Sequence, residues 1–303
     1  MVTQEEIEAF QRKHSALFRQ LDQDRAEVLP DPPKQLSHYT TANGLLGIVQ
    51  SNSLWATNAR FLNDFSELKY GADLFREVLE ESKTAIQDTL CSEHRLLERV
   101  SAHSMVAEIP SNFVVCLSEN ANQLSQWRAY GADGTGYSIG FDANSIRQLR
   151  WTHSRCLLLF KVCYQRDRQK ELLRKLLDKF FSRIKDEGVA ELKLFSSFLL
   201  ARLQDYLVSF KNSAFQEEGE WRLVHTIPIP THQKDLEFRV TGGLIVPYHV
   251  LKPAGSDLLP IESIYQGPRV APEISEEALH CLLWRSGYNR VKDCGIPLRR
   301  HAE

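Results

Sequence analysis

Charged side chains recur at every second position in one predicted strand. In the stretch QEEGEWRLVH, Glu218, Glu220 and Arg222 alternate with Trp221 and Leu223. Successive strand residues point to opposite faces, so the charged set shares one face and the apolar pair shares the other. A carboxylate there can orient a hydroxyl or stabilise a developing positive charge, and Arg222 can keep it ionised or bind a phosphate. A solvent-exposed face with a weak ion pair has the same pattern, and the residues leave both interpretations open.

The triplet His38-Tyr39-Thr40 ends a predicted strand at residues 36–40. An isolated histidine is by default a structural residue, although its imidazole can also bind a ligand. Tyr39 is expected to point to the opposite side of the strand from His38. Thr40 or Thr41 can cap the helix that follows, so both threonines also have a structural explanation.

Asn63, Asp64 and Glu67 stand at the start of another predicted helix. Carboxylates favour a helix N-terminus, which gives these residues a structural role, but Asp64 and Glu67 also share one helix face. Together with Glu218 and Glu220 they would supply four carboxylates to Mg²⁺, although no motif assembles them. A metal-dependent hydrolase is therefore one alternative function, and it requires these four carboxylates to meet without His38.

Aromatic residues gather in the stretch SQWRAYGADGTGYSIGF. Trp127 and Tyr130 fall on a short helix, and Tyr137 and Ser138 follow on a strand, where Ser138 and Gly140 are small enough to let a backbone or a planar ligand approach. Trp127 or Tyr130 can stack on a base, but a core role is more usual for such aromatics.

The overall composition argues against several classes of protein. With 37 basic and 39 acidic residues, the net charge of −2 does not indicate a generally basic nucleic-acid binder, although it allows local contact with nucleic acid. The sequence has no apolar run long enough to span a membrane and no signal-peptide pattern at its start, which predicts a cytoplasmic protein. Six cysteines without a C-x-x-C pair predict reduced thiols and no metal.

The order of the predicted elements indicates an α+β fold with a mixed, mainly antiparallel sheet and flanking helices. We expect an N-terminal helix within residues 1–30, with its apolar stripe over residues 3–24. A single α+β domain is expected over 36–299, with a helical hairpin inserted at about 167–211. Strands are predicted at 36–40, 54–57, 113–118, 134–141, 156–165, 220–227, 237–240, 242–250 and 259–267.

Several motifs, in the same order, resemble a bacterial family of unknown function, domain-of-unknown-function family 2971. They are HYT, FLND-x-x-E, CLSE, W-x-x-Y, GYSIGF, FKN-x-x-F-x-EE-x-EWR, G-x-LIVPY, I-x-x-IY-x-GP and GIPLR. The resemblance runs from about Leu36 to Arg299 and carries no function with it. The chain departs from the family at Phe65, where Pro is frequent, and in the IPLR ending.

A more distant resemblance carries the functional expectation. The stretch HYTTANGLLGIVQSNSLWAT resembles the first strand, helix and strand of ADP-ribosyltransferase-fold proteins, and GEWRLV resembles their late strand with the catalytic Glu. This implies that His38 and Glu220 are catalytic, and that NAD is the substrate. His38 would hold the ribose and amide side of NAD, while Trp55 or Tyr137 would stack on nicotinamide. Cleaving the nicotinamide glycosidic bond needs no metal. The cofactor-binding set that the resemblance implies is His38, Tyr39, Thr40, Trp55, Tyr137, Ser138 and Arg222.

The expected activity is therefore that of an NAD-dependent ADP-ribosyltransferase or NAD glycohydrolase, with an unidentified acceptor macromolecule. A bacterial toxin or phage-defence effector is compatible with it. The main alternative is a nucleotide- or nucleic-acid-binding module without catalysis, in which Arg128, Arg222 and Arg239 meet phosphates and Trp127 stacks. Proximity of His38 to Glu220 would favour the transferase.

Overall fold

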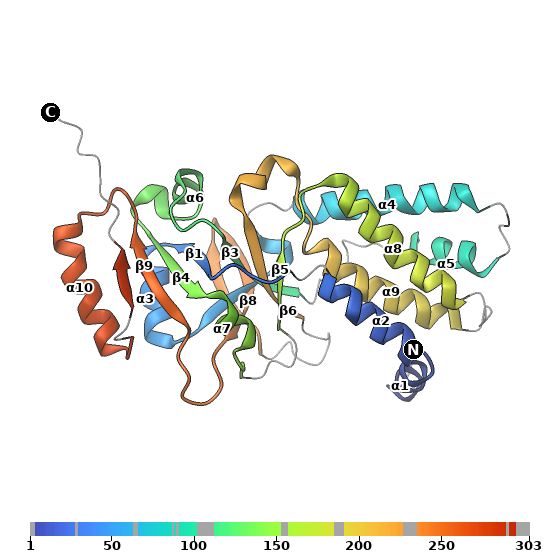
Figure 1. Cartoon of the computed structure of the whole chain (residues 1–303), viewed down its shortest axis with the longest axis horizontal. Helices are drawn as coiled ribbons and strands as arrows, with labels where there is room; N and C mark the ends of the chain where they lie inside the picture. Colours follow the sequence, from blue (N-terminus) through green and yellow to red (C-terminus); the bar gives the residue numbers. More distant parts are fainter. Residues whose placement is uncertain are drawn as a thin grey trace. The chain divides into compact units, whose positions relative to one another are not determined.

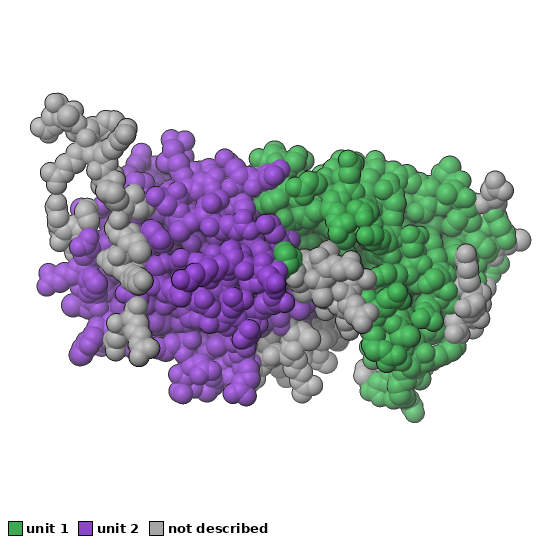
Figure 2. Space-filling view, in the orientation of Figure 1, with its two compact units in different colours: residues 1–30, 59–112, 162–215 green, residues 31–58, 113–161, 216–303 purple. Residues whose placement is uncertain are grey.

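In the computed structural model the chain divides into two units, each formed by three segments of the sequence (Figure 2). Unit 1 comprises residues 1–30, 59–112 and 162–215, and unit 2 comprises residues 31–58, 113–161 and 216–303. The structure describes residues 4–27, 30–62, 66–86, 88, 91–101, 112–152, 157–184, 191–226, 235–288 and 291–294.

Unit 1 is built from amphipathic helices whose apolar faces meet in one core (Figure 1). Leucine and phenylalanine side chains from all six of its longer helices are buried in that core, as expected for helices whose apolar residues recur every three or four positions. The predicted hairpin at 167–211 corresponds to α8 and α9. The helices are α1 (Gln4–Lys13), α2 (Ser15–Glu27), α4 (Ser66–Ala85), α5 (Ser92–Ser101), α8 (Arg166–Ile184) and α9 (Leu192–Leu207).

The N-terminal helix predicted over residues 3–24 is wrong in one respect, because the structure divides it into α1 and α2 at His14. The buried His14 ring contacts Phe10 and Phe195, and its Nε2 lies 2.9 Å from a carboxylate oxygen of Glu191. The contacts with Phe195 and Glu191 come from a segment far away in the sequence. Periodicity within residues 3–24 therefore could not indicate the interruption.

Unit 2 contains the sheet, and the α+β class predicted from the sequence is confirmed (Figure 1). The main strand order is β10-β9-β4-β1-β3-β2-β8-β7, and β6 pairs with both β3 and β5. The pairs β1–β3, β1–β4, β2–β3, β2–β8, β4–β9, β5–β6 and β7–β8 are antiparallel, whereas β9–β10 is parallel. The strands are β1 (Gln35–Thr40), β2 (Leu54–Asn58), β3 (Asn112–Ser118), β4 (Tyr137–Asp142), β5 (Leu157–Lys161), β6 (Glu220–Thr226), β7 (Glu237–Thr241), β8 (Leu244–Leu251), β9 (Ile261–Gln266) and β10 (Lys292–Cys294).

Helices α3 (Ala42–Ser51), α6 (Leu124–Ala129), α7 (Ala143–Gln148) and α10 (Pro272–Arg285) complete unit 2. Apolar residues of α3, α7 and α10 share one core with the sheet. Thr41 caps α3 by accepting a hydrogen bond from the Gly44 amide at 3.1 Å, and Asn52 ends the helix in the left-handed conformation. The predicted strand, helix, strand order of residues 36–57 is therefore confirmed.

Strand β3 has a position in the sheet that determines the candidate site. It pairs with β1 through Ser118 opposite Ser37, and with β2 through Val114 opposite Thr57. Cys116 lies between these two pairing positions. Strand β6 is also paired with β3, so the strand that carries His38 and the strand that carries Glu220 are both neighbours of β3.

Candidate functional site

The imidazole ring of His38 forms a hydrogen bond with the backbone of β3. Its Nδ1 donates a hydrogen bond to the carbonyl oxygen of Cys116 at 2.9 Å, between the positions where β3 pairs with β1 and β2. A carbonyl oxygen only accepts, so the proton of the neutral imidazole stays on Nδ1 and Nε2 is left as an acceptor. Burial lowers the pKa of His38, the Cys116 bond opposes that effect, and the positive charge of Arg239 adds to the lowering. His38 therefore presents a neutral ring with a defined acceptor nitrogen.

The lowered pKa of His38 predicts a pH-dependent stability. Because the unfolded histidine keeps a pKa near 6.5, it binds more protons than the folded one as the pH falls below that value. The stabilisation that neutral His38 provides is thus complete above about pH 6.5 and is lost at lower pH. In His38→Asn, whose amide can still donate to Cys116, we expect a weaker decrease between pH 7.5 and 5.5. Urea unfolding of both proteins at the two pH values measures it, and an equal decrease in both would contradict the prediction.

Arg239 on β7 lies among aromatic and hydroxyl groups, with no acidic partner among the described residues. Its Nη2 donates to the Thr57 hydroxyl at 2.7 Å. The guanidinium carbon lies 5.9 Å from the centre of the Trp55 ring and 5.6 Å from that of Tyr248. Those two rings stack on each other with centroids 4.6 Å apart. This arrangement, together with His38, is called the Arg239 site below.

The electrostatics of the Arg239 site are those of an incompletely compensated cation. The guanidinium is half-buried, its Nε is buried without a hydrogen-bond partner in the described part of the chain, and burial lowers its pKa. The carboxylate of Glu237 is exposed and raises the pKa of Tyr248, as does burial of that phenol. The sequence interpretation named Arg239 only for the binding alternative and missed Thr57 and Tyr248. The available signal was the alternation of residues along β2, β7 and β8, which indicates the side chains that share a face of each strand. It does not reveal which strands are neighbours.

Tyr39 belongs to a different polar cluster. Its hydroxyl donates to the Asn120 carbonyl at 2.6 Å and accepts from the Gln123 amide at 3.0 Å. Ser138 lies opposite Tyr39 in the β1–β4 pair and is fully buried, whereas His38 lies opposite the core residue Ile139. The strand register thus directs His38 and Tyr39 to opposite faces, as expected. Burial raises the pKa of Tyr39 to about 12, so its hydroxyl stays protonated.

Of the two aromatic residues proposed to stack on a base, Trp127 of α6 is not available, whereas Tyr130, which follows that helix, is only partly buried. Trp127 is fully buried, contacts the Tyr39 ring edge-on at 4.9 Å and donates from Nε1 to Asn122 at 2.9 Å. Tyr130 donates to a carboxylate oxygen of Glu218 at 3.3 Å. The core role that sequence patterns favour for Trp127 is confirmed.

Glu220 and Arg222 form a buried ion pair. Arg222 donates from Nε to Oε1 at 2.8 Å and from Nη2 to Oε2 at 2.9 Å, and both side chains are almost completely inaccessible to solvent. The interpretation of this strand face as solvent-exposed is therefore wrong. Strand β6 is paired with β3 and β5 along its edges, and the residues on both of its faces are buried. Alternation in the sequence shows neither feature.

Glu220 and His38 are connected through neighbouring residues of β3. Ser118, which pairs with Ser37 beside His38, donates from its hydroxyl to the carbonyl of Glu218 at 2.7 Å. The backbone amide of Glu119 donates to the carbonyl oxygen of Gly219 at 3.0 Å, immediately before Glu220 in the chain. The strands that carry His38 and Glu220 therefore both contact β3 near its C-terminal end.

The remaining predicted residues have separate surroundings. Thr40 pairs with Tyr137 at the end of β1, and the Tyr137 hydroxyl lies 2.9 Å from that of Ser275. The space beside Gly140 is occupied by the side chains of Gln35 and Ser263, which excludes a planar ligand there.

The carboxylates proposed for a metal site are only partly observable. Asn63 and Asp64 lie outside the described residues, and Glu67 falls in α4 at a position whose side chain is not described. In the described part of the chain, the structure shows no group of three or more His, Cys, Asp or Glu side chains that could hold a metal ion. No described helix is long and apolar enough to cross a membrane.

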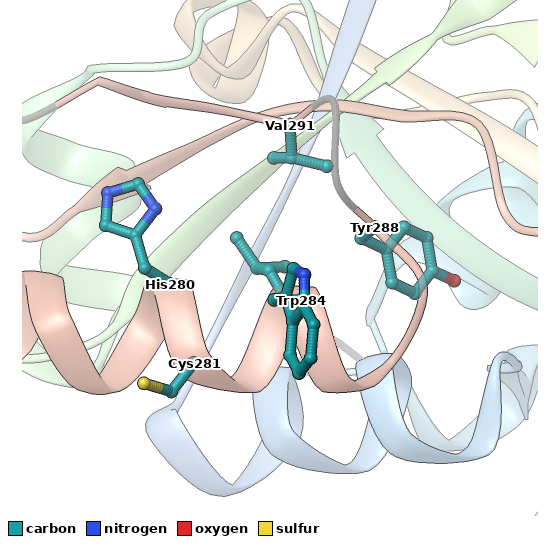
Figure 3. Close-up of a pocket in the computed structure, with 6 residues that line it drawn as sticks. His280, Cys281, Trp284, Tyr288 and Val291 are labelled. Atoms are coloured by element: carbon teal, nitrogen blue, oxygen red, sulfur yellow. The ribbon is translucent and has the colours of Figure 1, made fainter.

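A pocket at α10 is lined by none of the predicted site residues (Figure 3). His280, Cys281 and Trp284 line it from the helix, while Tyr288 and Val291 line it from the segment that follows. Its walls are mostly apolar, and the Tyr288 hydroxyl donates to Asn52 at 2.7 Å. Neither a charged cluster nor a buried unpartnered polar group is recorded at this pocket within the described residues.

Comparison with known proteins links part of this arrangement to one family. Residues 126–223 match the family model described as protein of unknown function (DUF2971). The DUF2971 match covers about a third of the chain and includes Trp127, Tyr137, Glu220 and Arg222, but it does not reach His38 or Arg239. No curated protein and no solved structure matches the chain. The comparisons therefore support the family resemblance for this segment and name no activity.

Proposed function

We propose that this protein binds NAD and cleaves its nicotinamide glycosidic bond, as an ADP-ribosyltransferase or an NAD glycohydrolase. The observation that carries the proposal is the common attachment of His38 and of the Glu220 strand to the same end of β3. A neutral imidazole acceptor and an ionised carboxylate on either side of one strand suit a substrate whose ribose lies between them. Trp55, which is 44% exposed beside the Arg239 site, is the better candidate for ring stacking than Tyr137, whose hydroxyl contacts Ser275.

The proposed reaction assigns one task to each group. The bond between the ribose C1′ and the pyridinium nitrogen breaks, and its electron pair neutralises the leaving nicotinamide. The carboxylate of Glu220 stabilises the developing oxocarbenium ion and orients a ribose hydroxyl. His38 Nε2 accepts a hydrogen bond from the substrate. The acceptor oxygen, from water or from a macromolecule, then bonds to C1′ and loses its proton to solvent.

Nicotinamide release by Glu220→Gln tests the role of that carboxylate. We expect a loss of about 100-fold or more, the size seen when a group that stabilises a transition-state charge is removed. Glu217→Gln is the matched control, because Glu217 is exposed three positions away and should leave the rate unchanged. Circular dichroism and thermal unfolding establish that each variant is folded. A folded Glu220→Gln protein with the wild-type rate would exclude the assigned role.

A binding module without cleavage is the second candidate function. It is favoured by one specific observation, namely that Arg222 already binds both carboxylate oxygens of Glu220 in a buried position. A carboxylate held in this way has less freedom to engage a ribose. NAD binding without nicotinamide release, in the presence of acceptors, would decide for this candidate.

The cellular role and location belong to the same proposal. NAD cleavage in the cytoplasm would suit a bacterial toxin or phage-defence effector, because loss of NAD or modification of an essential macromolecule stops growth. The acceptor would then be a macromolecule of the target cell.

A further inference from the structure

We infer that the Arg239 site binds the phosphate of a small nucleotide, with the ring of the same ligand stacked on Trp55. The choice of a nucleotide rests on the proposed function, but binding at Arg239 does not require catalysis. The residues that carry the inference are Arg239, Thr57, Trp55 and Tyr248, on three neighbouring strands.

The guanidinium of Arg239 is partly desolvated without an ionic partner among the described residues. Removing a charged group from water is costly unless it is paired and hydrogen-bonded. Arg239 has lost part of its hydration, yet the described residues give it one hydroxyl partner, two aromatic rings and no carboxylate. The rings compensate only part of the cost. A phosphate would supply the missing anionic partner to the part of the guanidinium that stays exposed, in the planar geometry that arginine prefers.

The exposed ring of Trp55 lies beside the Arg239 guanidinium. Trp55 is covered on one side by Tyr248 but keeps 44% of its surface exposed. An exposed indole next to a cation offers a stacking surface for a ring and an electrostatic site for the anion attached to it. His38 adds a hydrogen-bond acceptor near the same cation, and Arg239 is close enough to influence its protonation.

The charge of the chain favours a small ligand over a polymer. Long nucleic acids are bound through many phosphate contacts by an extended positive surface. The whole chain has a net charge of −2. Among the described residues that define the site, Arg239 alone is a permanent cation, whereas a polymer would need a row of them. These features favour a mononucleotide or dinucleotide over a polymer.

Titration with ADP, adenosine and inorganic pyrophosphate tests the inference, with Trp fluorescence and calorimetry as readouts. We expect ADP to bind the wild-type protein at least about tenfold more tightly than adenosine or pyrophosphate, since only ADP uses both subsites. Arg239→Gln should weaken ADP binding by about 10- to 100-fold, as expected when hydrogen bonds to a charged group are lost. Adenosine affinity should stay within about twofold, because stacking does not involve Arg239 directly.

Two further variants make the test specific. Arg269→Gln is the matched control, because Arg269 is exposed and paired with Asp133, and it should leave ADP binding unchanged. Trp55→Ala should weaken both ADP and adenosine. Absence of ADP binding to the wild-type protein, equal binding by Arg239→Gln, or preference for an oligonucleotide would each overturn the inference. Because these readouts need no turnover, ADP binding through Arg239 without nicotinamide release would refute only the proposed cleavage.

Discussion

Replacing Arg222 by methionine is expected to lower the free energy of unfolding by about 3–5 kcal/mol. The side chain is almost completely buried and makes two hydrogen bonds to Glu220. Methionine fills a similar volume but removes the guanidinium from the Glu220 carboxylate, of which only 7% is exposed. The cost is that of breaking a buried ion pair by removal of one partner, which is far larger than the contribution of an exposed ion pair.

Urea unfolding followed by circular dichroism measures this loss. Arg269→Met is the matched control, because it breaks the exposed pair with Asp133 and should change stability by less than about 1 kcal/mol. The double variant Glu220→Leu/Arg222→Met should recover most of the loss, since it removes both charges. An Arg222→Met protein as stable as wild type would show that Glu220 is not held by this pair, and it would weaken the argument for a non-catalytic role.

Truncation of Trp127 to alanine is expected to destabilise the protein by about 3–5 kcal/mol. The indole is one of the largest fully buried side chains, and its removal leaves a cavity beside Tyr39 and breaks the hydrogen bond to Asn122. The same denaturant titration measures the change. Leu124→Ala is a control in the same short helix, where the side chain is 58% exposed and the expected effect is below about 0.5 kcal/mol. Similar losses in both variants would contradict the packing described for α6.

The secondary structure was largely predictable because it depends on local patterns. Apolar spacing predicted the helical hairpin of α8 and α9, and a threonine cap indicated the start of α3, whereas the short helix α7 was not predicted. The break at His14 was not predictable, since it depends on Glu191 and Phe195. Likewise, alternation in β6 indicated two faces, but it could not show that the residues on both of them are buried.

The candidate site was predictable only in its separate parts. His38, Trp55 and Glu220 were recognised by residue type and by resemblance, whereas the partners that define their chemistry are distant in the sequence. Cys116 fixes the tautomer of His38, and Arg239 reaches Trp55 through pairing of β7 with β8 and of β8 with β2. Strand order is a property of the whole sheet, so no local pattern could have joined these residues.

The most direct test of the proposed function is incubation of the purified protein with NAD labelled in its nicotinamide ring. A desalted cell lysate supplies macromolecular acceptors, and Glu220→Gln is assayed in parallel to correct for other NAD-consuming enzymes. We expect free nicotinamide from the wild-type protein, with an equal amount of ADP-ribose either free or attached to an acceptor, and little nicotinamide from the variant. Intact NAD after prolonged incubation with folded wild-type protein would contradict it.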